Sequence, residues 1–197
     1  SGMPDKFEVA RALRELALLL EADGANPVKI RAYERGARAV EVLETHQDQD
    51  ELLLVHFMEP HLPYQEPVAI QGTWAKSVPD GLPTEVNRTS LQKIRTDNPG
   101  FAAIHDYVVA RYDQEILALD QALPALFAAA GPTATVVLVS DHGEELHENG
   151  GWAHCGDLAW ETVLATPFVL AGPGIAVGER ATPVSNRKNF GCATCLT

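Results

Sequence analysis

The segment from Ser140 to His154 holds the densest group of chemically active side chains in the sequence. Asp141 and His142 are adjacent and directly follow a predicted strand. A carboxylate oxygen and an imidazole nitrogen can bind one divalent cation, and Gly143 lets the backbone turn away from it. The spacing therefore predicts a cation site at Asp141 and His142, to which His154 could return. A polar turn after a strand, without a metal, fits the same spacing.

A second cluster, at residues 56–64, also follows a predicted strand. It places His61 between Pro60 and Pro63. Each proline fixes its own φ, so the loop has few conformations and can hold the His61 ring in one direction. A ring held in this way can donate a hydrogen bond to an anionic substrate. A rigid loop with a surface histidine is the alternative reading.

Strands and one long helix must position these two clusters. The apolar run at 52–57 predicts a strand buried on both faces, and β-branched residues predict strands at 135–140 and 167–171. Residues 101–130 predict a helix that Pro124 should kink or split. This order predicts an α/β fold with a mostly parallel sheet and flanking helices. The apolar positions of the long helix are Ile104, Val108, Tyr112, Ile116, Leu119, Leu123 and Leu126.

Residues 1–45 predict a helical hairpin, which precedes this fold. A turn is expected at Asp23-Gly24, and Asn26 with Pro27 marks the start of the second helix. The polar stretch at 46–51 predicts a linker to an α/β domain over 52–197. The expected inward positions are Val9, Leu13, Leu16 and Leu20 in the first helix and Ile30, Tyr33, Ala37 and Val40 in the second, with Asp5 and Glu8 as a capping box.

The composition excludes several classes of protein. With 46% hydrophobic residues the chain is not disordered, and its 15 Lys and Arg against 27 Asp and Glu give a net charge of −12. That charge disfavours binding to nucleic acid or anionic membranes and favours cations. No apolar run reaches the roughly 20 residues of a membrane span. No signal peptide is recognised, so we expect a cytoplasmic protein that does not bind membranes.

The two histidine clusters, in this order, resemble the sulfatase family of the alkaline-phosphatase superfamily. The resemblance covers residues 51–185. Residues 54–64 are similar to the family's strand and H-x-x-x-P-H-x-P-Y loop, and residues 135–154 to its T-V-V-x-x-S-D-H-G-E-x-L segment with the histidine that follows. Residues 166–178 are similar to the next strand and its G-P-G-x-x-x-G turn.

This resemblance implies an alkaline-phosphatase-like fold and hydrolysis of small sulfuric or phosphoric esters. It implies that Asp141 and His142 bind the active-site divalent cation, usually Ca²⁺ in sulfatases. It also implies that His61 and His154 contact the ester oxygens or assist the leaving group. A cation and imidazolium donors suit this reaction, because negative charge develops on the transferring group.

Two motifs of the sulfatase family are not found in this sequence. One is the paired-aspartate metal motif, and the other is C/S-x-P-x-R, the source of the formylglycine nucleophile. Ser77 begins an S-x-P triplet without the arginine, and no cysteine among Cys155, Cys192 and Cys195 has proline two residues later. We therefore expect a truncated sulfatase-like domain with impaired turnover.

Residues 5–43, and 21–33 above all, resemble the start of the N-terminal helical domain of bacterial family X DNA polymerases. This resemblance implies an alternative function, a DNA-binding module that contacts phosphates through basic side chains. Residues 1–45 nevertheless have a net charge of −1, which favours a solvated helix face over DNA binding. The candidate contacts are Lys29, Arg31, Arg35 and Arg38.

Two partial resemblances in one sequence favour a fusion of two parent proteins. Residues 186–197 support this reading, because they leave the sulfatase pattern. A third alternative is a non-catalytic protein in which a homo-oligomer or a complementing chain covers open sheet edges.

Overall fold

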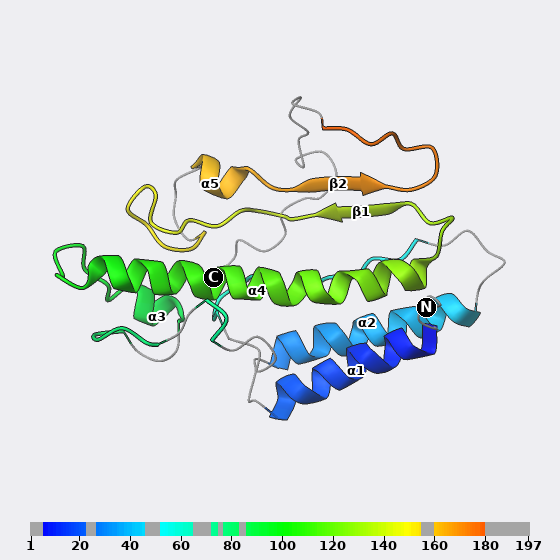
Figure 1. Ribbon diagram of the computed structural model, residues 1–197, viewed down its shortest axis with the longest axis horizontal. Coiled ribbons are helices and arrows are strands. Elements are labelled where there is room, and N and C mark those ends of the chain that lie inside the picture. The colour runs from blue at the N-terminus through cyan, green and yellow to red at the C-terminus, as the bar shows by residue number, and fades with distance from the viewer. Residues whose placement is uncertain are drawn as a thin grey trace. The chain divides into compact units, whose positions relative to one another are not determined.

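The computed structural model describes residues 6–22, 27–45, 52–64, 72–74, 77–82, 86–154 and 160–179. The chain divides into two compact units, Ser1–Gly131 and Pro132–Thr197. The first unit contains the helices α1 (Lys6–Ala22), α2 (Pro27–Thr45), α3 (Arg88–Leu91) and α4 (Phe101–Ala130), and the second contains β1 (Val136–Val139), α5 (Glu161–Leu164) and β2 (Phe168–Ala171) (Figure 1). The predicted linker at 46–51, the turn at Asp23-Gly24, the N-cap Asn26, Asp5 and the three cysteines lie outside the described residues.

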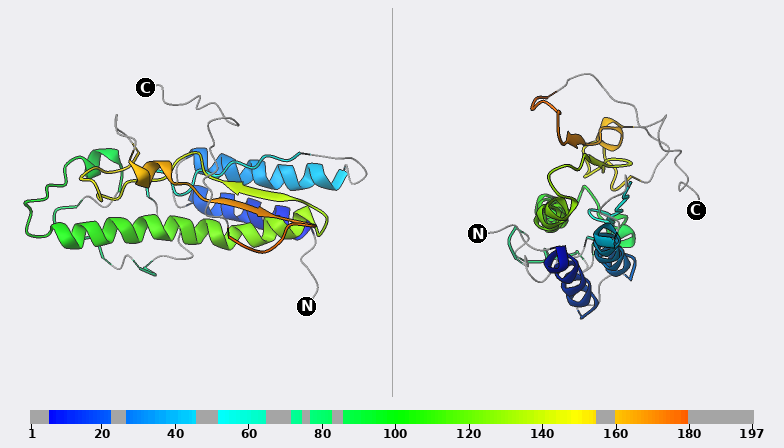
Figure 2. Two further views of the ribbon diagram at one scale, coloured as in Figure 1. Left: turned by 90° about the horizontal axis from the view of Figure 1, so that it is seen from above. Right: turned by 90° about the vertical axis from the view of Figure 1, so that its right-hand side faces the viewer.

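The predicted helical hairpin is confirmed by α1 and α2. Pro27 is the first residue of α2, as expected of a residue that has no N–H to leave unpaired. Tyr33, Ala37 and Val40 are buried and form one apolar cluster with three residues of α1, namely Ala10, Leu13 and Ala17. Residues of α4 pack against the same cluster, and Figure 2 (right) shows the three helices end-on as a bundle.

Helix α4 differs from its prediction at two positions. It continues without a break through Pro124, because the proline removes a single backbone hydrogen bond while Leu123 is buried and Leu126 packs on the hairpin cluster. Ile116 is exposed, contrary to its expected inward position. Ile116 lies twelve positions after buried Ile104. At about 100° per residue, its side chain therefore lies roughly 120° around the helix from that of Ile104. Gln114 and Glu115 are buried at this level instead.

The strand predicted at 52–57 is absent, because these residues form no described strand. Leu52 and Leu54 are almost fully exposed, with 98% and 80% of their surface accessible. A strand exists only through pairing with a neighbour, and hydrophobicity alone does not provide one. Phe57, at the end of the run, packs on the cluster of α1 and α2.

The strands predicted at 135–140 and 167–171 are confirmed as β1 and β2. They pair antiparallel, with Val136 opposite Ala171 and Val139 opposite Phe168. The mostly parallel sheet therefore stays a prediction. Among the described helices, none has both the length and the apolar character that crossing a membrane requires.

Candidate functional site

Gly143 is required by a close approach of two backbones in the second unit. Its N–H donates to the carbonyl oxygen of Val163 at 2.7 Å. A Cβ at this position would lie 2.1 Å from the carbonyl oxygen of Thr162 and 3.0 Å from that of Ala165. Only glycine fits such a contact. The spacing predicts that Gly143 is needed for a turn. The structure shows that it is needed because the backbone of residues 162–165 packs directly against it.

Asp141 and His142 follow β1 and are held by local hydrogen bonds. The His142 N–H donates to Oδ1 of Asp141 at 3.0 Å, and Oγ of Ser140 donates to the His142 carbonyl at 2.6 Å. Nδ1 of His142 lies 2.7 Å from the Gly143 carbonyl oxygen. A carbonyl oxygen only accepts, so Nδ1 carries the proton and the neutral ring has its lone pair on Nε2. That Nε2 atom lies 3.8 Å from Oδ1 of Asp141.

These two atoms fit a shared divalent cation. Metal–ligand distances of about 2.0–2.6 Å allow one ion to bind two atoms at this separation. Calcium prefers oxygen ligands and imidazole suits zinc, so the mixed pair does not by itself select Ca²⁺. Two side chains do not complete a coordination shell. Within the described part of the chain, no group of three or more His, Cys, Asp or Glu residues could hold a metal ion.

His154 lies against His142 in the second unit. The two ring centroids are 3.9 Å apart, and the ring planes meet at 37°. Nδ1 of His154 donates to Oε1 of Glu144 at 3.1 Å, and the Glu144 side chain is only 5% exposed. A carboxylate in this position fixes the tautomer and the orientation of the imidazole. The structure thus brings the predicted residues Asp141, His142 and His154 into one cluster.

Sequence reasoning missed Glu144 as the residue that orients His154. The only signal in the sequence is that Glu144 lies in the segment from Ser140 to His154, directly after Gly143. Charged residues are expected at the surface, and nothing in the spacing shows that His154 returns to this particular carboxylate.

Glu145 is a second missed residue, because it organises the loop that returns to His154. It is 3% exposed, and its Oε1 accepts hydrogen bonds from the backbone N–H of Asn149 at 2.9 Å and of Gly151 at 3.0 Å. Its carbonyl accepts from the N–H of Ala153 at 2.8 Å. The loop therefore closes around one buried carboxylate, and His154 follows directly after it.

His61 lies in the first unit, on a loop between Met58 and Tyr64. Its N–H donates to the Met58 carbonyl at 2.8 Å and closes a turn with Glu59 and Pro60 at its centre. Nδ1 of His61 donates to the Leu62 carbonyl at 2.6 Å, so the lone pair of the neutral ring is on Nε2. The backbone and the ring of His61 are thus each held by a hydrogen bond within the loop.

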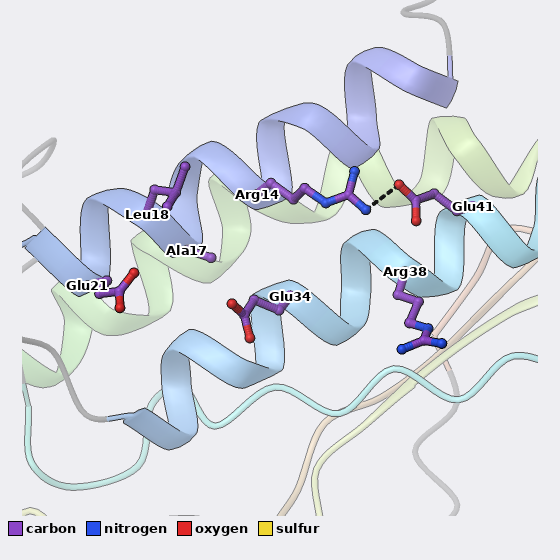
Figure 3. A pocket seen from close by; sticks show the side chains of 7 residues that line it. All are labelled: Arg14, Ala17, Leu18, Glu21, Glu34, Arg38 and Glu41. Carbon is purple, nitrogen blue, oxygen red and sulfur yellow. Dashed lines mark ion pairs between the residues drawn. The ribbon is translucent and has the colours of Figure 1, made fainter.

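The predicted phosphate contacts lie on α2. Arg31, Arg35 and Arg38 are exposed, and the side chain of Lys29 lies outside the described residues. Arg38 borders a groove of about 550 Å³ between α1 and α2, which Figure 3 shows with an ion pair between Arg14 and Glu41. The groove is lined by Arg14, Ala17, Leu18, Glu21, Glu34, Arg38 and Glu41. Its three carboxylates outnumber its two arginines, which opposes binding of an anionic ester or a phosphate.

Of the comparisons with known proteins, one gives a match. The family model described as Sulfatase matches residues 35–191. Neither the curated proteins nor the solved structures give a match. The family match begins within α2 and includes His61, Asp141, His142 and His154. It covers most of the sequence, and the chain therefore belongs to the sulfatase family.

Proposed function

We propose that this sulfatase-family chain binds a divalent cation through Asp141 and His142. We propose that His154, beside them, and His61, in the first unit, each donate a hydrogen bond to oxyanions of small sulfate or phosphate esters. One observation carries the proposal. Oδ1 of Asp141 and Nε2 of His142 lie 3.8 Å apart, the His142 tautomer leaves that nitrogen able to bind a metal, and His154 contacts the same ring.

Each histidine has a chemical role in this proposal. When bound, a divalent cation withdraws electron density from an ester oxygen. His154, protonated on Nε2 as well as on Nδ1, would donate to the bridging oxygen, so that the alcohol could leave as a neutral molecule when water or another nucleophile attacks sulfur or phosphorus. Glu144 holds the His154 ring through Nδ1 during this transfer. His61, protonated on Nε2 as well as on Nδ1, can donate from Nε2 to a non-bridging oxygen while its Nδ1 keeps the hydrogen bond to the Leu62 carbonyl.

We further propose that covalent turnover by these residues is impaired. The sequence contains no C/S-x-P-x-R motif, and the described cluster offers histidines and carboxylates but no activated nucleophile. The residues given roles here bind and polarise an ester. Attack on sulfur or phosphorus would need water or a group that this sequence does not provide.

Calorimetric titration with Ca²⁺, Mn²⁺ and Zn²⁺ tests the cation site. We expect one site per chain that is lost in Asp141→Ala/His142→Ala. The matched control is His105→Ala/Asp106→Ala, which removes an adjacent histidine and aspartate from α4, where Nδ1 and Oδ1 lie 3.5 Å apart. The control should bind the cation as the parent does.

The same variants separate binding from catalysis. With the preferred cation present, 4-nitrophenyl sulfate and 4-nitrophenyl phosphate should turn over no faster with the parent than with His142→Ala. Equal cation binding by the parent and by the Asp141→Ala/His142→Ala variant would reject the proposed site. Rapid turnover that depends on His142 would support the proposed cation site and reject the proposal that turnover is impaired.

A further inference from the structure

Tyr33 connects the N-terminal hairpin to the loop that carries His61. It lies on α2 and is only 2% exposed. Its ring meets that of Phe57 edge to face, with the centroids 6.0 Å apart and the planes at 63°. Phe57 also packs on the apolar cluster of α1 and α2. The residue that leads into the His61 loop is therefore anchored on the hairpin.

The Tyr33 hydroxyl makes a second connection, to Glu59 in the centre of the turn. The hydroxyl donates to the Glu59 carboxylate. Burial, and then the negative charges of Glu59 and Glu115, raise the pKa of Tyr33 far above its ordinary value, so the hydroxyl keeps its proton. Oε2 of Glu59 is buried and has no hydrogen-bond partner among the described residues. Tyr33 is thus an important donor to this carboxylate.

The other side of the loop is fixed by α4 and by a bridge to a neighbouring segment. Nη2 of Arg111 donates to the Tyr64 carbonyl at 2.7 Å, and the Tyr64 N–H donates to the Val86 carbonyl at 2.9 Å. The Tyr64 ring packs on Tyr112 with the centroids 5.5 Å apart. Tyr64 is thus fixed on one side of His61, and Glu59 lies two residues before His61 on the other.

We propose that Tyr33 is a positioning residue for His61. Through Phe57 and Glu59 the N-terminal hairpin supports the ester-binding loop of the sulfatase fold. This inference rests on the proposed role of His61 in binding the oxyanion. It gives the hairpin a structural role in supporting His61. Removing one hydroxyl from α2 should therefore change the geometry of a histidine on another segment.

Substitution Tyr33→Phe tests the inference, because it keeps the ring on Phe57 and removes only the donor. Imidazole ¹H–¹⁵N NMR of the full chain would follow His61, with its signals assigned by their loss in His61→Gln. We expect the His61 ring signals to shift and the affinity for inorganic sulfate to fall about fivefold, the effect of one hydrogen bond. Tyr107→Phe is the matched control, since it removes the hydroxyl of another buried tyrosine, on α4.

Further readouts separate positioning from stability and from the proposed function. If Tyr33→Phe unfolds, Tyr33→Phe/Glu59→Gln removes the buried charge and should fold with the same His61 shift. His61 signals and sulfate affinity that match those of Tyr107→Phe would overturn the inference. If the parent does not bind sulfate, the proposed function fails, while the ring signals still decide whether Tyr33 positions His61.

Discussion

At the scale of single residues, Gly143 is the position where packing most directly controls the candidate cation site. Gly143→Ala places a Cβ 2.1 Å from the Thr162 carbonyl oxygen, so the backbone beside His142 must move. We expect a loss of about 1–3 kcal/mol in the free energy of unfolding, measured by urea denaturation, and weaker cation binding.

Gly150→Ala is the control for this substitution. Gly150 has φ of +89°, and no atom lies within 4 Å of the place that a Cβ would take, so the change costs about 1–2 kcal/mol of backbone energy without a collision. Cation affinity should then be unchanged. Equal loss of affinity in both variants would show that general destabilisation, and not contact at Gly143, affects the site.

The residues that could be predicted from sequence are those with distinctive chemistry at short spacing. Their spacing predicts Asp141, His142 and His154, and the structure places these three together. Spacing does not predict Glu144 and Glu145, because the burial of a carboxylate depends on which donors the folded loop brings to it. That information lies in the tertiary structure and not in the spacing.

At the scale of elements, the loop from Glu145 to Ala153 depends on one carboxylate. Glu145→Ala removes the acceptor of the Asn149 and Gly151 amides, and we expect both to exchange their hydrogens at least about tenfold faster, for a cost of about 1–3 kcal/mol. Hydrogen exchange followed by NMR measures this directly. The His154 signals should shift as well, because His154 directly follows the loop.

Glu148→Ala provides a control within the same loop. Oε2 of Glu148 accepts from the Leu146 N–H at 2.7 Å, but this bond is exposed and water can replace it. Exchange at Asn149 and Gly151 should stay slow in this variant. Fast exchange in both variants would mean that burial of the Glu145 carboxylate has no special role.

Helices were more predictable than strand pairing for a physical reason. The inward face of α2, with Tyr33, Ala37 and Val40, follows from local periodicity, and the structure confirms it. The run at 52–57 has the composition of a strand, but pairing depends on residues far away in sequence. The antiparallel register of β1 and β2 could not be predicted from either strand alone.

At the scale of the whole molecule, a strongly acidic chain carries an exposed apolar ribbon. All four residues of β2 are exposed, including Phe168, Val169 and Leu170. An isolated pair of strands is marginally stable in water and presents open edges to other chains. The net charge of −12 opposes contact between copies of the chain. Self-association should therefore depend on how far salt screens this repulsion.

We predict that the mean mass measured by light scattering rises between about 0.1 M and about 1 M salt, as the screening length falls from about 10 Å to about 3 Å. Val169→Lys should suppress this rise, because it places a charge in the middle of β2. Ile116→Lys adds the same charge at an exposed position of α4 and should leave the rise unchanged. A mass that falls with salt would instead indicate assembly through ion pairs, since screening weakens attraction between opposite charges as well as repulsion between like ones.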